Sequence, residues 1–156
     1  LHLDSRNLRD FGLTQTNIYL GFAPGDKVSE QKQLQVSTIL LPAFQRMTEQ
    51  ELALAPKLRL SADSLDLGSF DGRKRIKGEI ELTNTGRSPL EVRNLQMFSN
   101  GLEISLNKTK IEPGGQAKLK VTAIADQIKE PKRTLRILMI TNDPDRGKVV
   151  IKINVR

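Results

Sequence analysis

The sequence contains neither cysteine nor tryptophan, and its 156 residues include one histidine and one tyrosine. Without cysteine the chain can form no disulfide, no thiolate nucleophile and no cysteine-ligated zinc site. A Ser-His-Asp triad would have to use His2 at the N-terminal end of the sequence, and metal sites built on two histidines are excluded. The usual constellations of hydrolases and zinc proteins are therefore missing, and we expect neither enzymatic activity nor a cofactor.

Aromatic residues make up 4% of the chain. The aromatic stacking platform of single-strand binders is therefore missing, which makes nucleic acid an unfavoured partner. No apolar run approaches the about 18 residues that a membrane-spanning helix requires. Neither a Walker loop nor a dinucleotide fingerprint occurs, so no small-molecule substrate is expected. The sequence begins with Leu1, and we expect a processed or trimmed product whose targeting segment is not present.

The net charge of +7 is unevenly distributed. Residues 1–56 hold five Lys or Arg against six Asp or Glu, a net charge of −1, whereas residues 57–156 hold twenty against twelve, a net charge of +8. A basic segment favours anionic partners such as nucleic acid, lipid headgroups or acidic glycans. The basic residues are mostly scattered, so a soluble surface with a positive bias is the simpler interpretation.

Residues 17–22 and 33–41 are rich in β-forming side chains, and apolar or β-branched residues alternate with mostly polar ones in the second run. The segment between them begins with Pro24, Gly25 and Asp26, which is a strong turn signal. This pattern predicts a β-hairpin with a long loop. Two isolated strands are marginally stable, so the hairpin must pack on something, and a second copy of the chain is one candidate.

The pattern changes at Thr48. Thr48 and Glu51 have the spacing of a capping box, in which each side chain accepts a hydrogen bond from the other residue's backbone N–H. Residues 53–55 suit a helix, and Pro56 ends it. The segment predicts a short helix that connects two units.

From Lys57 onward the periodicity is that of β-strands. In residues 75–82, apolar or small residues alternate with Arg, Lys and Glu, which predicts one buried and one solvated face. Residues 135–140 are apolar on both faces, as in a central strand. About seven short strands with turn signals between them predict an antiparallel β-sandwich. No helical pattern separates these strands, which argues against a βαβ fold.

The stretch ITNDPDRG, residues 140–147, brings Asn142, Asp143 and Asp145 within four positions. A calcium loop normally collects about six or more oxygen ligands, and the EF-hand spacing is absent. Asn and Asp also hydrogen-bond the backbone of turns, and Pro144 fixes φ. We therefore predict no metal site here, but a corner between two strands in which Asn142 and Asp143 hold backbone amides.

Four segments carry a resemblance to a known family: LDLGSF (65–70), GEIELTNTGRSPLEV (78–92), IEPGGQAKLKVTA (111–123) and ITNDPDRGKVVIKINV (140–155). They resemble the immunoglobulin-like domains of the Hydin and major-sperm-protein type. More closely, they look like a bacterial domain of unknown function from that superfamily, found in envelope and secreted proteins. Members commonly carry a Cys-containing segment in the middle of the domain, whereas residues 95–106 here have none.

The resemblance implies an all-β protein with three parts. Residues 57–156 form an immunoglobulin-like antiparallel β-sandwich, and residues 47–56 form a helical linker. Residues 1–46 form a β segment that is either the remnant of a preceding Ig-like domain or an extension of the main sandwich. The resemblance also implies a non-catalytic structural or interaction module in an extracytoplasmic location: periplasmic, outer envelope or secreted. Its expected partner is a protein, or a second copy, bound through a sheet edge.

A polyanion-binding module is the alternative, with an acidic glycan or nucleic acid bound on a basic sheet face. The candidate residues are Arg73, Lys74, Arg75, Lys77, Lys118, Lys120 and Arg136. The sequence does not decide whether their strands are neighbours. Two modification motifs, Asn107-Lys108-Thr109 for N-glycosylation and Asp63-Ser64-Leu65 for O-glycosylation, are short enough to arise by chance.

Overall fold

The computed structural model describes residues 4–42, 47–98, 100–128 and 134–156. They divide into two compact units, residues 1–40 and residues 41–156, and each is described by itself. Within the described ranges, no helix has the length and apolar character needed to cross a membrane. His2 lies outside the described residues, as do residues 43–46, where the first unit was expected to end.

The first unit is a two-stranded antiparallel hairpin. Its elements are η1 (Ser5–Asn7), β1 (Gly12–Tyr19), η2 (Glu30–Lys32) and β2 (Gln33–Leu40). The strands pair without interruption from Gly12 opposite Leu40 to Tyr19 opposite Gln33. The predicted hairpin is confirmed, but its first strand was placed too far along the chain. Residues 20–22 belong to the loop, where the Leu20 N–H donates to the Lys32 carbonyl and the Phe22 N–H donates to the Asp26 carboxylate.

Asp26 closes this loop, as the Pro-Gly-Asp signal indicated. Its carboxylate accepts a hydrogen bond from the Phe22 N–H at 2.8 Å and from the Lys32 ammonium at 3.1 Å. The bond from the Phe22 amide, followed by that from Lys32, lowers the pKa of Asp26. The Lys32 Nζ also lies 5.5 Å from the centre of the Phe22 ring.

The second unit begins with α1 (Glu49–Leu54), and its capping box is present. The Thr48 N–H donates to a Glu51 carboxylate oxygen at 2.7 Å, and the Glu51 N–H donates to the Thr48 hydroxyl at 3.3 Å. Residues 55–57 then cross over Gly86, where an added Cβ would lie 2.3 Å from the Ala55 carbonyl oxygen. Only a glycine allows the two backbones to approach so closely.

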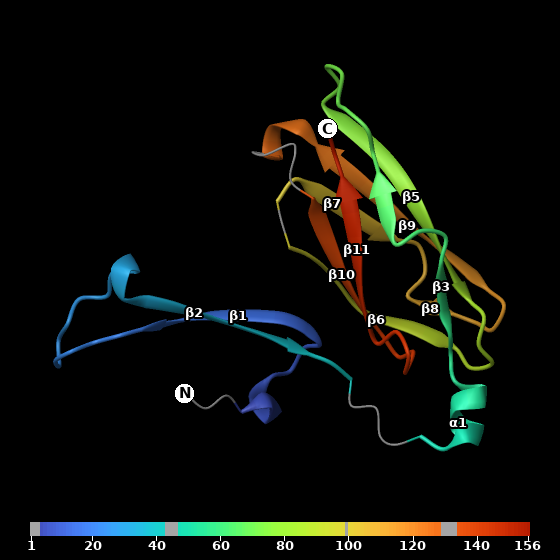
Figure 1. The fold of residues 1–156 in the computed structure, drawn as a ribbon, viewed down its shortest axis with the longest axis horizontal. Coiled ribbons are helices and arrows are strands. Elements are labelled where there is room, and N and C mark those ends of the chain that lie inside the picture. Colours follow the sequence, from blue (N-terminus) through green and yellow to red (C-terminus); the bar gives the residue numbers. More distant parts are fainter. Residues whose placement is uncertain (1–3, 43–46, 99, 129–133) are drawn as a thin grey trace. The chain divides into compact units, whose positions relative to one another are not determined.

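The remaining elements form a β-sandwich. They are β3 (Leu58–Leu60), β4 (Ser64–Asp66), β5 (Arg75–Asn84), β6 (Leu90–Met97), β7 (Leu102–Leu106), β8 (Lys110–Ile111), β9 (Gln116–Ile124), η3 (Ala125–Gln127), β10 (Leu135–Thr141) and β11 (Lys148–Asn154). One sheet has the order β4-β11-β10-β6-β8 and the other has the order β3-β5-β9-β7, and the two pack face to face (Figure 1). The β4–β11 pair is parallel, and the other pairs are antiparallel. The predicted all-β sandwich is confirmed.

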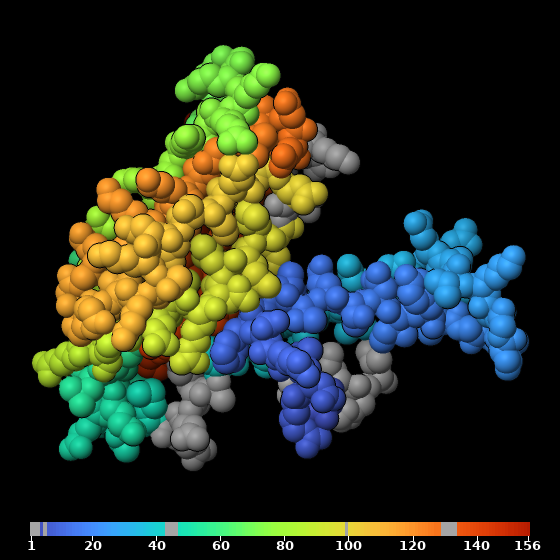
Figure 2. Space-filling model, turned by 180° about the vertical axis from the view of Figure 1, so that it is seen from behind, coloured from blue at the N-terminus to red at the C-terminus, as the bar shows by residue number. Residues whose placement is uncertain are grey.

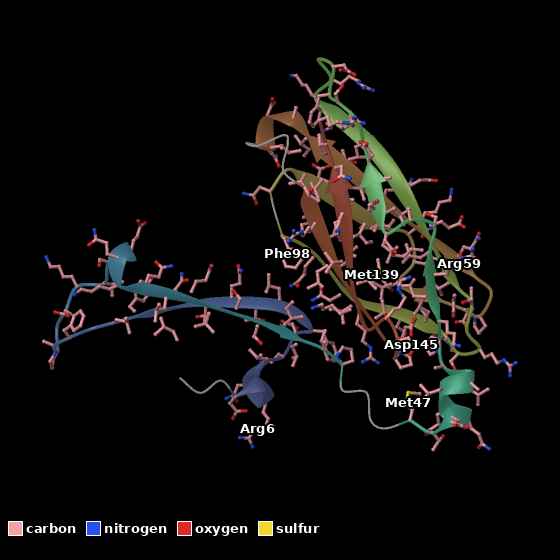
Figure 3. All side chains as sticks on the ribbon, in the orientation of Figure 1. Arg6, Met47, Arg59, Phe98, Met139 and Asp145 are labelled. Atoms are coloured by element: carbon pink, nitrogen blue, oxygen red, sulfur yellow. The ribbon has the colours of Figure 1, made fainter. Side chains whose placement is uncertain are left out.

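Alternating side chains of the two sheets make the core. On β5 and β9, buried Ile80, Leu82 and Leu119 alternate with polar residues that are exposed or half-buried. Strand β10 lies between β11 and β6, and Arg136 is its one exposed residue. Met139 on β10 is fully buried within the sandwich (Figure 3). The prediction of a central strand at residues 135–140 is confirmed.

Candidate functional site

The turn between β10 and β11 is formed by the ITNDPDRG stretch. Asp143 is 1% exposed. One of its carboxylate oxygens accepts the Leu58 N–H at 2.7 Å, and the other accepts the Asp145 N–H at 2.8 Å. The Asn142 side chain accepts the Glu91 N–H at 2.7 Å. The predicted corner is therefore confirmed: both side chains hold backbone amides, and both Asp143 oxygens are occupied by N–H donors.

Asn84 performs the same task for the amide of Lys57, the residue before Leu58, and no motif in the sequence singled it out. It is fully buried. Its side-chain oxygen accepts the N–H groups of Lys57 and Gly86, and its side-chain nitrogen donates to the carbonyls of Ser88 and Ile111. An amide has two donors and one double acceptor, so this side chain is fully satisfied. Asn84 and Asp143 are thus structural residues.

The described residues form no metal centre. No group of three or more His, Asp or Glu in that part of the chain is placed to hold a metal ion. Among the same residues, every buried side-chain nitrogen or oxygen has a hydrogen-bond partner. No unpartnered polar group in the described core therefore indicates a ligand.

The candidate basic residues do not form one basic face. The pairing of β5 with β9 brings Arg75, Lys77, Lys118 and Lys120 onto the outer face of the four-stranded sheet. Arg136 lies on β10 in the other sheet. Arg73 and Lys74 lie before β5, where the Arg73 guanidinium is 3.4 Å from the Asp71 carboxylate. The sequence could not place these residues because strand order is not visible in local periodicity.

Carboxylates are interleaved with the four basic residues of that face. The Lys118 Nζ lies 3.1 Å from the Glu79 carboxylate, and an Arg75 nitrogen lies 3.3 Å from Glu103. Glu81 accepts a hydrogen bond from Gln116 at 2.9 Å. The outer face therefore carries charges of both signs, which reduces the attraction of a polyanion.

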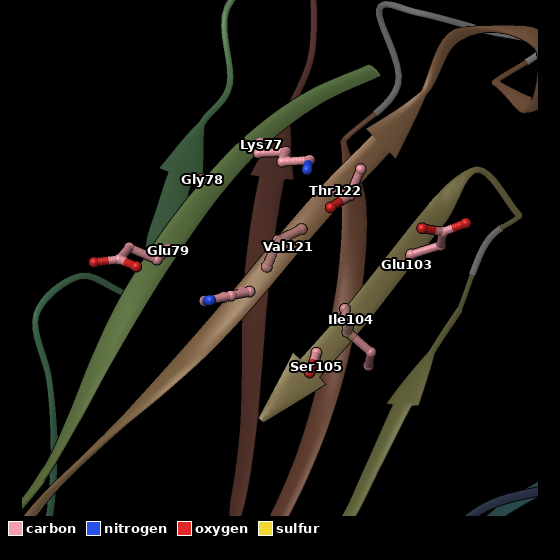
Figure 4. A pocket seen from close by; sticks show the side chains of 9 residues that line it. Lys77, Gly78, Glu79, Glu103, Ile104, Ser105, Val121 and Thr122 are labelled. Atoms are coloured by element: carbon pink, nitrogen blue, oxygen red, sulfur yellow. The ribbon is translucent and has the colours of Figure 1, made fainter. Parts of the chain in front are cut away.

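A depression of about 520 Å³ lies on this face between β5, β9 and β7 (Figure 4). The side chains around it include Lys77, Glu79, Glu103, Ser105 and Lys120. Among the described residues, neither the Lys77 nor the Lys120 ammonium has a carboxylate within ion-pair distance. The site is shallow and mixed in charge, so it has no feature specific to one class of ligand.

Strand β7 offers a more definite feature, an open edge. It pairs with β9 and is the last strand of its sheet. The other edge strands of the sandwich have two or three residues, whereas β7 has five. Short edges resist strand addition, and a longer one is a template for it.

The hydrogen-bonding direction of β7 follows from its ends. The Ile124 N–H donates to the Gly101 carbonyl, and the Asn107 N–H donates to the Lys118 carbonyl. Because hydrogen-bonded pairs recur every second residue, Glu103 and Ser105 direct their backbone groups at β9. Ile104 then directs its N–H and C=O at the free edge.

An apolar patch lies beside this edge, where β6 and β7 leave the sandwich incompletely covered. Met97 is 43% exposed and Phe98 is 39% exposed. Three partly exposed side chains that pack against the core complete the patch: Leu95, Ile104 and Leu106. We call these five residues the β6–β7 patch. In the space-filling view, the surface of β6 and β7, in yellow, faces the viewer (Figure 2). Alternation in the sequence identified these strands but gave no sign that β7 lies at an edge.

Comparison with known proteins agrees with this architecture. A crystal structure of a protein of unknown function from Porphyromonas gingivalis W83 is similar at a TM-score of 0.74 and 26% identity, over 95% of this chain and 66% of that one. The chain thus spans less than two thirds of that protein. The secreted serine protease VesC from Vibrio cholerae aligns at a TM-score of 0.46 and 15% identity, over 67% of this chain and 23% of that one. No curated protein sequence matches.

The two sheets and their order define an immunoglobulin-like β-sandwich. A family model described as "HYDIN/CFA65/VesB-like, Ig-like domain" matches residues 56–154. The chain belongs to this HYDIN/CFA65/VesB-like family of Ig-like domains. Membership supports a non-catalytic structural module.

Proposed function

We propose that the protein is an interaction module of a bacterial envelope or secreted protein that binds another protein through the open β7 edge. The observation that carries the proposal is the five-residue edge of β7 next to the β6–β7 patch. Main-chain groups at such an edge supply affinity, and a neighbouring apolar surface supplies specificity. The absence of catalytic constellations from the sequence is consistent with this role.

The bacterial and extracytoplasmic parts of the proposal have separate support. The four resembling segments in the sequence are similar to a bacterial domain of envelope and secreted proteins, and the P. gingivalis protein is bacterial. In the same proposal, residues 57–156 are the module, residues 47–56 link it, and residues 1–46 are a separate β segment. Cell fractionation of the native host tests the location: recovery with cytoplasmic markers would contradict it.

A polyanion-binding role has less support, because Glu79, Glu81 and Glu103 lie among the basic side chains of the outer face. Any binding of a sulfated polysaccharide should be weak and should fall steeply with salt.

Photo-cross-linking in the native host tests the edge. A photoreactive residue at Ile104 should give adducts whose mass identifies one protein, either a different protein or the same chain. The matched control carries the same group at Gln116, which is exposed on the outer face of β9. Equal adducts at both positions, or none at position 104, would overturn the β7 edge as the binding surface.

A further inference from the structure

The β1–β2 hairpin has two different faces. Residues paired across the strands share a face, so Ile18 lies beside Leu34 and Thr16 beside Val36. The apolar hairpin face consists of Thr14, Thr16, Ile18, Leu34, Val36, Thr38 and Leu40. Most of the opposite face is polar, with Gln15 beside Ser37 and Asn17 beside Gln35.

Among residues 4–40, the described part of the first unit, none buries the apolar hairpin face. Leu34 is 53% exposed, and Gly12 is the one buried residue among those described before Leu41. Strand β2 pairs with β1 in a two-stranded sheet, which leaves the backbone groups on its other side free within this unit. The hairpin therefore presents an open edge and an apolar face together.

From this, and resting on the proposed function above, we infer that the partner of the β7 edge is the β1–β2 hairpin of a second copy of the chain. Strand β2 would add beside β7 as a fifth strand of the four-stranded sheet. Its alternation fits that position: Leu34 and Val36 would face the β6–β7 patch, while Gln35 and Ser37 would continue the polar outer face. Neither residues 13–19 nor residues 33–39 include a charged residue. The polar hairpin face therefore brings no like charge beside Glu103 or Lys120.

The size of the surfaces predicts the strength of this contact. Two eight-residue strands present a face of roughly 27 by 10 Å, from the spacings of a β-sheet. Such a face falls short of the about 1,200 Å² of total buried area that specific, stable interfaces reach. Association should therefore be weak and concentration-dependent.

The contact joins two different surfaces, and it is heterologous. Each copy offers one hairpin and one edge, so an unblocked chain can extend beyond a dimer or close into a ring. This property separates it from a symmetric contact in which two hairpins meet face to face.

Sedimentation of the full 156-residue chain from about 10 μM to about 1 mM, a range chosen for weak interfaces, tests the inference. The wild-type chain should associate as concentration rises. Leu34→Lys places a charge on the apolar hairpin face and should weaken association at least tenfold. Its matched control, Gln35→Lys, places the same charge on the polar face, which would stay exposed to solvent, and should change association much less than Leu34→Lys.

The edge is blocked by Ile104→Pro, which removes the free N–H, with Ile104→Ala as the control that shortens the side chain and keeps the N–H. Ile104→Pro should abolish association, whereas Ile104→Ala, which loses part of the β6–β7 patch but keeps the N–H, should weaken association without abolishing it. Far-UV circular dichroism and thermal melts establish that each variant is folded.

Mixing the two blocked variants is the decisive step. Leu34→Lys retains its edge and Ile104→Pro retains its hairpin, so the mixture should form a heterodimer and nothing larger. A mixture that stays monomeric while the wild-type chain associates would overturn the inference, and so would a wild-type chain that stays monomeric at every concentration. If position 104 still cross-links one different protein in the host, the proposed function stands without self-association.

Discussion

Three polar side chains, those of buried Asn84 and Asp143 and half-buried Asn142, fasten the ends of strands in this domain. Asn84, Asn142 and Asp143 each bind backbone groups from a distant part of the chain. Local chemistry predicted that Asn142 and Asp143 would hold amides, because Asn and Asp do so in turns. The identity of those amides, Glu91 and Leu58, depends on strand order and could not be predicted from residues 140–147 alone.

Removing the Asp143 carboxylate should destabilise the domain. Asp143→Ala leaves the N–H groups of Leu58 and Asp145 without an acceptor in a buried place, and the expected loss is about 2–4 kcal/mol of unfolding free energy. Asp145→Ala is the matched control, because Asp145 is exposed and its carboxylate has no partner among the described residues. Urea unfolding followed by circular dichroism measures both. Similar losses of unfolding free energy for the two variants would show that the Asp143 carboxylate stabilises the domain no more than an exposed carboxylate does.

Among the elements, the regular strands were predictable and the change of sheet was not. The strict alternation of residues 75–82 identified β5 with its buried and solvated faces. Strands β3 and β4 lie close together in sequence, yet β3 pairs with β5 and β4 pairs with β11 in the other sheet. Gly78 makes room for this crossing, since a Cβ there would lie 2.6 Å from a Leu67 methyl carbon. No local pattern announces such a change.

The cap of α1 should respond to acid. The Thr48 backbone N–H, followed by its hydroxyl, lowers the pKa of Glu51 from its ordinary value of 4.5. Because the pKa is lower in the folded state, the capping contribution is present above pH 4.5 and is lost as pH falls through that lower value. The Thr48 amide proton should therefore shift in NMR spectra below pH 4.5. Glu51→Gln should preserve the cap and remove the pH-dependent shift of the Thr48 amide proton. Glu49→Gln is the control and should retain that shift. An unchanged titration in Glu51→Gln would assign the shift to another group.

At the scale of the whole molecule, the two units differ in how much they bury. The sandwich has a continuous core, whereas the hairpin has two strands and an uncovered apolar face. Composition predicted that residues 57–156 are basic. The pairing of β5 with β9 places Glu79 and Glu81 opposite Lys120 and Lys118, so the positive charge does not gather on one face of the domain. The small size of the hairpin, which makes it marginally stable alone, was predictable from the sequence. The edge position of β7 follows only from the order of the strands.

Hydrogen exchange at low micromolar concentration should separate the two units. Amides of β1 and β2 should exchange at least about 100-fold faster than those of β5, β9 and β10, because local opening of a two-stranded hairpin exposes little apolar surface. Mass spectrometry of peptides from each strand measures this ratio. Equal protection in the hairpin and the sandwich would mean that the hairpin is held as firmly as the core at that concentration.

The bond between Asp143 and Leu58 also sets an order of events during synthesis. The two residues are separated by 85 positions. The Leu58 amide of β3 therefore gains its hydrogen-bond acceptor only after the turn between β10 and β11 has been synthesised. On a ribosome, β3 emerges soon before its partner β5, but β3 and β4 both emerge long before the β10–β11 turn and β11 that also bind them. The sandwich can therefore complete its folding only when β10 and β11 have left the exit tunnel. Until then its early strands are exposed and have to be protected from pairing with other chains.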